Sequence, residues 1–128
     1  MAKNIKFKYL YSDAGNYKKF GYAIFSNPES IPIDEVREKL EKAFEQKMFF
    51  IAQQVDLQEL FFEDFPSDDD ISFHEFDGLE VTDEPLNSLS KLTIKQFVEL
   101  VDLESSKGWK VFDPWERLFH FDNLQGDE

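Results

Sequence analysis

The chain has 128 residues, a mass of 15.1 kDa and a formal net charge of −13. Its 21 aromatic side chains, 15 of them Phe, exclude a disordered chain, because their burial can offset the entropy lost on folding. The absence of Cys excludes disulfides and thiolate chemistry, and no apolar run approaches the ~20 residues of a membrane span or resembles a signal peptide. We therefore expect one cytoplasmic domain over residues 1–128, frayed at 125–128.

The N-terminal segment predicts an antiparallel hairpin. Every second residue is apolar, which is the period of a strand with one buried face, at Ile5, Phe7, Tyr9 and Tyr11. Residues 13–16 have turn chemistry, and residues 17–25 alternate again as a second strand. Within that second strand, Gly21 indicates a bulge or a close backbone approach.

Residues 33–46 predict the clearest helix of the chain. Apolar side chains recur there at the spacing of one helical face, at Val36, Leu40, Ala43 and Phe44. A short buried strand is expected at 48–52. Another strand is expected at 71–81, where Phe73, Glu75, Asp77 and Leu79 alternate with His74, Phe76 and Glu80. The imperfect alternation of this last strand suits an edge position.

Two helix starts are predicted in the C-terminal third. Thr93 as N-cap with Gln96 three residues later forms a capping box, and Asp113-Pro114 begins a shorter helix that we expect to run to about Phe119. An aromatic series either closes the core or forms a binding platform, at Trp109, Phe112, Trp115, Phe119 and Phe121. The expected fold class is α+β: an antiparallel sheet of about four strands, one long helix packed on a face, and a C-terminal helix.

The charge is distributed unevenly along the chain. Residues 1–47 have nine basic and seven acidic side chains, whereas residues 48–128 have five basic and twenty acidic ones. Between Met48 and Ser90 there are twelve carboxylates and no Lys or Arg, so nucleic acid and anionic membranes would be repelled and a basic protein attracted. The alternative interpretation is a solvated acidic face that only confers solubility. The candidate partner-binding residues are Glu63, Asp64, Asp68, Asp69, Asp70, Glu75, Asp77 and Glu80.

Motifs for catalysis, metals and cofactors are weak. His74-Glu75 is not the start of a zinc-binding His-Glu-x-x-His, because position 78 is Gly. A calcium loop starting at Asp68 fails, because Phe73 stands where Gly is required. We therefore expect no metal, no cofactor and no enzymatic activity. The alternative is a small enzyme or ligand-binding protein that uses a pocket near His74 and Glu75.

Three short segments indicate a family. They are Asp13-Ala14-Gly15-Asn16-Tyr17, Phe25-Ser26-Asn27-Pro28 and His74-Glu75-Phe76. Together they resemble a family of small, acidic, uncharacterised bacterial proteins, over roughly residues 5–80. The resemblance implies a setting of toxin–immunity neighbourhoods and no catalytic residue. The expected function is a non-enzymatic acidic module that binds a basic protein, in its sharpest form an immunity or inhibitor protein whose carboxylates replace phosphates on a basic toxin or nuclease. The oligomeric state stays open.

Overall fold

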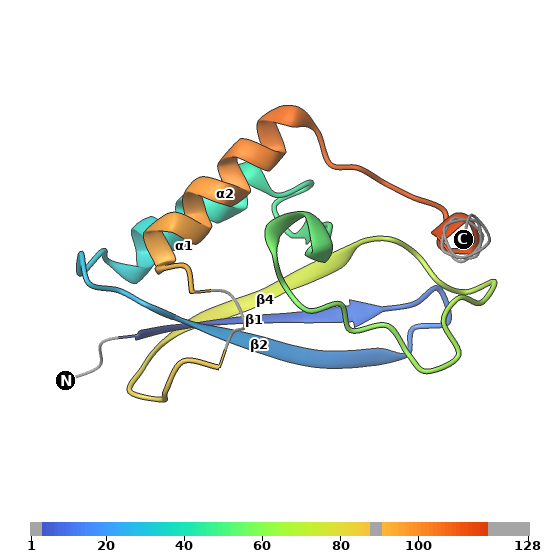
Figure 1. The fold of residues 1–128 in the computed structure, drawn as a ribbon, viewed down its shortest axis with the longest axis horizontal. Helices are drawn as coiled ribbons and strands as arrows, with labels where there is room; N and C mark the ends of the chain where they lie inside the picture. The colour runs from blue at the N-terminus through green and yellow to red at the C-terminus, as the bar shows by residue number, and fades with distance from the viewer. Residues whose placement is uncertain (1–3, 88–90, 118–128) are drawn as a thin grey trace, which may run out of the picture.

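The computed structural model describes residues 4–87 and 91–117 (Figure 1). The elements in chain order are β1 (Asn4–Ser12), β2 (Lys18–Ser26), α1 (Ile33–Ala43), β3 (Phe49–Phe50), the 3-10 helix η1 (Ala52–Val55), β4 (His74–Thr82) and α2 (Ile94–Lys107). A helical turn follows at 114–117. The rest of the predicted third helix, with Phe119 and Phe121, and the tail at 125–128 lie outside the described residues.

The four strands form one antiparallel sheet in the order β2-β1-β4-β3, which confirms the predicted α+β class. The predicted hairpin pairs β1 with β2 in unbroken register, from Asn4 opposite Ser26 to Ser12 opposite Lys18. β1 is therefore an inner strand, and its side chains on the core face are all buried, at Ile5, Phe7, Tyr9 and Tyr11. The hydrophobic alternation that predicted this strand also determines which of its faces enters the core.

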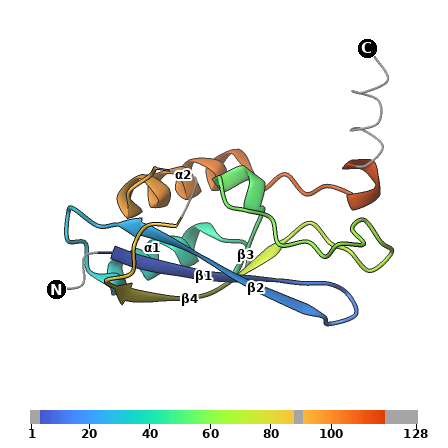
Figure 2. The ribbon, with the colours of Figure 1, turned by 60° about the horizontal axis from the view of Figure 1, so that its bottom comes forward.

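Both helices lie on the same face of the sheet, and the opposite face is open (Figures 1 and 2). The ring of Phe97 on α2 packs against Phe7 and Phe25 of the sheet, with centroids 5.1 and 4.5 Å apart. On α1, Val36 and Leu40 are fully buried, as the amphipathic pattern predicts. No helix within 4–87 and 91–117 is long and apolar enough to cross a membrane.

The expectation of one long helix is not clearly supported, because the described residues contain two helices of similar length. α2 has 14 residues and α1 has 11. The predicted capping box is present in α2, because the Thr93 side chain accepts the Gln96 N–H and the Gln96 side chain accepts the Thr93 N–H. α1 ends three residues earlier than predicted, because Phe44 adopts an extended conformation and leads into the turn before β3.

β4 departs from the predicted alternation at a bulge. Tyr9 pairs with Phe76 and Lys8 pairs with Gly78, so Asp77 has no opposite residue in β1. The bulge places Leu79 on the same face as Phe76, and the predicted grouping of Leu79 with Glu75 is therefore wrong. β4 lies between β1 and β3, but β3 pairs only with its first two residues. The expected edge position therefore applies to the later part of the strand.

Candidate functional site

The eight predicted partner-binding residues fall into two groups. Five lie in the loop between η1 and β4, at Glu63, Asp64, Asp68, Asp69 and Asp70. Three lie on β4, at Glu75, Asp77 and Glu80. Since the loop packs against the β1–β2 turn and Glu80 lies opposite Lys6, toward the other end of β1, Glu80 lies apart from the loop group.

The loop is held in place by hydrogen bonds to the hairpin. The Ala14 N–H donates to the Asp69 carbonyl over 2.8 Å, and the buried Tyr11 hydroxyl donates to the Asp70 carboxylate. The same hydroxyl accepts the Ile71 N–H over 3.0 Å. Burial, and then the bond to Asp70, raise the pKa of Tyr11 well above its usual range. Tyr11 therefore stays protonated and fixes the end of the loop.

The members of this loop have different roles. Asp70 is half-buried, and its second oxygen accepts the Ser67 N–H over 2.7 Å, so both oxygens of its carboxylate accept hydrogen bonds within the protein. The other four carboxylates are exposed and form no ion pair with any residue that the structure describes. We call these four the acidic loop: Glu63, Asp64, Asp68 and Asp69. Of the five predicted loop residues, the candidate site therefore keeps these four and no longer includes Asp70.

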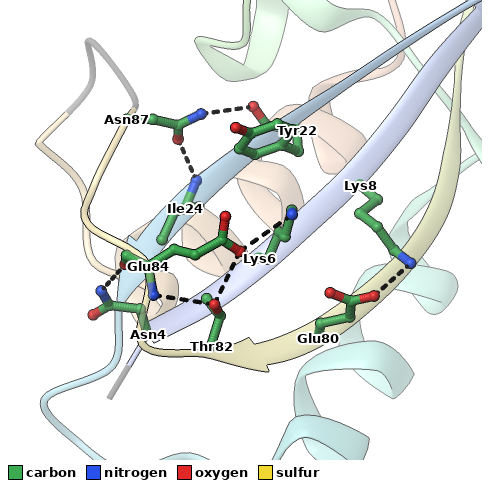
Figure 3. A network of polar contacts seen from close by, with 9 residues as sticks. All are labelled: Asn4, Lys6, Lys8, Tyr22, Ile24, Glu80, Thr82, Glu84 and Asn87. Carbon is green, nitrogen blue, oxygen red and sulfur yellow. Dashed lines mark hydrogen bonds and ion pairs between the residues drawn. The ribbon is translucent and has the colours of Figure 1, made fainter. Parts of the chain in front are cut away.

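On the open face of the sheet, lysines of β1 neutralise carboxylates that follow Gly78 (Figure 3). Lys8 Nζ lies 3.0 Å from Glu80, and Lys6 Nζ lies 3.2 Å from Glu84. The bond from Lys6 holds the pKa of Glu84 below its usual value. Lys6 also lies over the Tyr22 ring, 4.3 Å from its centroid. Glu80 thus forms a surface ion pair with Lys8, whereas Asp77 is exposed and Glu75 is half-buried.

His74, the other candidate centre, is a core residue. Its side chain is 0% exposed, and its Nε2 accepts the Leu60 N–H over 2.9 Å. The rings of Tyr11 and Phe61 lie on it, each with its centroid 5.2 Å away. Burial, and then the charge of Arg117, lower the pKa of His74 to about 4, so the imidazole is neutral near pH 7. A substrate could reach it only if this packing opened.

A cavity of about 730 Å³ is lined by Phe73, the residue before His74, but not by His74 itself. It is bounded by the C-terminal ends of both helices and by four aromatic residues, Phe44, Phe49, Phe73 and Trp109. The Trp109 indole N–H donates to the Ala43 carbonyl over 3.2 Å, so this ring joins α1 to the segment after α2. Trp115 is 47% exposed. Of the predicted aromatic series, Trp109 is therefore packed between two segments, whereas Trp115 is exposed.

Arg117 has a structural role that was not predicted from the sequence. Its guanidinium forms an ion pair with Glu59, donates to the Gln53 side chain over 2.8 Å, and lies 3.9 Å from the centroid of Phe112. These contacts fasten the segment after α2 to the segment after η1. A signal was present, because Arg117 is the last basic residue of a strongly acidic half. Its partner could not be chosen among so many carboxylates.

Neither a metal-binding cluster in the described residues nor a match to a known protein helps to assign a function to this site. In the part of the chain that the structure describes, no three His, Asp or Glu side chains are grouped so that they could hold a metal ion. Comparisons with protein-family models, with curated proteins and with solved structures found no match. Function is therefore argued from the geometry of the acidic loop and of the sheet.

Proposed function

We propose that this protein is a non-enzymatic acidic module that binds a basic protein through the acidic loop. The observation that supports the proposal is the contrast in pairing. Glu59, Glu80 and Glu84 each have a basic partner within the chain, whereas the four carboxylates of the acidic loop are exposed and unpaired in the described residues. Unpaired charges that are held in place can steer an oppositely charged partner and fix its orientation.

The most specific form of the proposal is an immunity or inhibitor protein. The acidic loop places two pairs of adjacent carboxylates, at 63–64 and 68–69, on a segment fixed by Tyr11 and Ala14. Such an array can occupy cationic positions on a basic nuclease or toxin that would otherwise hold phosphates. The use of His74 and Glu75 as an enzymatic or ligand site is not proposed, because His74 is screened from solvent and accepts a backbone N–H.

The test separates the acidic loop from the total charge. The probe is a lysine-rich peptide, and its affinity is measured by titration calorimetry at low and at physiological ionic strength. The loop variant carries Asp64→Asn, Asp68→Asn and Asp69→Asn. The matched control carries Glu38→Gln, Glu99→Gln and Asp102→Asn, which remove the same charge from exposed helix positions that form no ion pair in the described residues.

We expect the loop variant to bind the peptide at least about tenfold more weakly at low salt, because it loses several charge-assisted contacts. The control should lose only the small part due to net charge. Equal losses in the two variants would show that the peptide senses total charge, and the proposal would then be wrong. Unchanged binding in both would have the same consequence.

A further inference from the structure

The outer edge of β2 is the starting observation. Asn87, in the segment after β4, uses its side-chain amide as a strand would: its oxygen accepts the Ile24 N–H over 2.7 Å, and its nitrogen donates to the Tyr22 carbonyl over 3.3 Å (Figure 3). These bonds show that the backbone groups of Tyr22 and Ile24 point away from β1. Because backbone direction alternates along a strand, those of Phe20 point away as well.

Toward the hairpin turn, this edge has no hydrogen-bonding partner within residues 4–87 and 91–117. Neither the N–H and carbonyl of Phe20 nor the Tyr22 N–H is bonded to any described residue. Phe20 is 64% exposed on the open face. Unpaired strand edges of this kind accept an extended segment as an additional strand.

A hollow of about 300 Å³ adjoins the same edge, on the side where η1 lies. Its apolar lining includes Tyr9, Ala23 and Leu57, and its polar lining consists of Gln53, Asp56, Gln58 and Asn87. Asp56 is exposed there, in a left-handed conformation (φ 61°), and forms no ion pair with a described residue. An unpaired carboxylate beside apolar side chains suits the long stem and cationic head of Lys or Arg.

We propose that the edge of β2 between Phe20 and Tyr22 takes up an extended segment of the basic partner, with one Lys or Arg side chain entering this hollow toward Asp56. The inference rests on the proposed function, which supplies a basic partner. The Asn87 amide occupies the position opposite Ala23, so the cationic residue of the added segment faces Gly21, between Phe20 and Tyr22. Alternation then directs its side chain to the face that contains the hollow.

The probe is a blocked pentapeptide, Val-Thr-Lys-Thr-Val, compared with the same peptide containing norleucine in place of Lys. Binding is followed by NMR, through amide shifts and hydrogen exchange of Phe20 and Tyr22. Phe20→Pro removes an N–H that points away from β1, so the hairpin can persist, and Phe20→Ala is its control because it removes only the ring. Asp56→Asn keeps a residue type that tolerates the left-handed conformation, and Asp102→Asn on α2 is its control.

We expect slower exchange at Tyr22 when the lysine peptide binds, and roughly tenfold weaker binding for Phe20→Pro and for Asp56→Asn. The norleucine peptide should bind about as weakly to wild type as the lysine peptide binds to Asp56→Asn. Exchange at Tyr22 in the wild type decides the matter if Phe20→Pro does not fold. Unchanged exchange there, with peptide bound, would overturn the inference.

Two further outcomes separate this inference from the function on which it rests. If the acidic-loop variant loses binding of the lysine-rich peptide while Phe20→Pro and Asp56→Asn bind both peptides normally, the proposed function stands and the edge site is wrong. Sedimentation tests a second occupant: self-association of wild type that Phe20→Pro abolishes would assign the edge to a second copy of the chain and overturn the proposal.

Discussion

At the scale of single residues, His74 shows how burial changes the chemistry that a residue type suggests. In the sequence it stands beside Glu75, which invites a catalytic or metal-binding interpretation. In the structure, adjacent positions of β4 face opposite sides of the sheet, so His74 enters the core while Glu75 faces the open side. Which of the two would face inward depended on the pairing of β4 with β1, and the bulge after Phe76 obscured that parity in the sequence.

The stability of the protein should report the burial of His74. Its pKa is about 4 in the folded protein and about 6.5 when exposed, so below pH 6.5 the unfolded chain binds a proton that the folded one excludes. The contribution of the neutral imidazole is complete above pH 6.5 and is lost as pH falls toward 4. The difference amounts to up to about 3 kcal/mol.

The measurement is urea unfolding of wild type and His74→Gln between pH 7 and pH 4. The variant keeps a side-chain acceptor for the Leu60 N–H, and the other titrating groups are shared by both proteins. We expect the gap in unfolding free energy between them to shrink as pH falls. Parallel curves over this interval would contradict the buried, neutral assignment.

At the scale of elements, β2 depends on one glycine. A Cβ at Gly21 would lie 2.9 Å from Leu60 Cδ2 and 3.0 Å from Cδ1, so a side chain comes close to this glycine, rather than the backbone expected from the sequence. The approaching residue belongs to the segment after η1, about forty positions away in the chain. Sequence pattern identified the position that needs a small residue, but the neighbour is a matter of tertiary packing.

Gly21→Ala should therefore destabilise the protein by about 1–3 kcal/mol, because the buried Leu60 side chain must move. The measurement is chemical unfolding, with Gly15→Ala as the control, since a Cβ there has its nearest contacts at 3.4 Å. In a Leu60→Ala background the same Gly21→Ala change should cost less. Equal cost in both backgrounds would show that Leu60 is not the cause.

The helices and strands differ in how far local sequence defined them. The start of α2 was predictable to the residue, because its capping box uses only side-chain bonds between neighbours in the chain. The end of α1 and the bulge in β4 were not. Phe44 leaves the helix to pack against Phe7 and Phe50, and Asp77 is expelled from the ladder by the register with β1. Long-range contacts override local propensity at both positions.

At the scale of the whole molecule, the net charge of −13 acts against compactness, because folding brings like charges together. Added salt screens this repulsion, with a screening length of about 10 Å at 0.1 M. It also weakens the surface pairs Lys6–Glu84 and Lys8–Glu80, but such pairs contribute only ~0–1 kcal/mol each. Repulsion among the excess carboxylates should dominate.

The unfolding free energy at pH 7 is therefore expected to rise when sodium chloride is raised from about 0.01 to 0.15 M. The expected gain is on the order of 1 kcal/mol, the scale of one close charge pair in water. Near pH 4.5, the sequence isoelectric point, the gain should vanish because the net charge is close to zero. A fall in stability with salt at pH 7 would show that the internal ion pairs outweigh the repulsion.

Local features of the chain were sufficient to predict the hairpin, the amphipathic α1, the start of α2 and the concentration of carboxylates after Met48. Each depends on the period or capping chemistry of near neighbours, or on counting. The tertiary structure was needed to show that Lys6 and Lys8 neutralise Glu84 and Glu80. It was also needed to show that His74 is buried and that the Tyr11 hydroxyl donates to Asp70. The extent of the free edge of β2 likewise depends on the position of Asn87, which bonds to Ile24. These features arise between segments up to about eighty residues apart, whose approach no local pattern encodes.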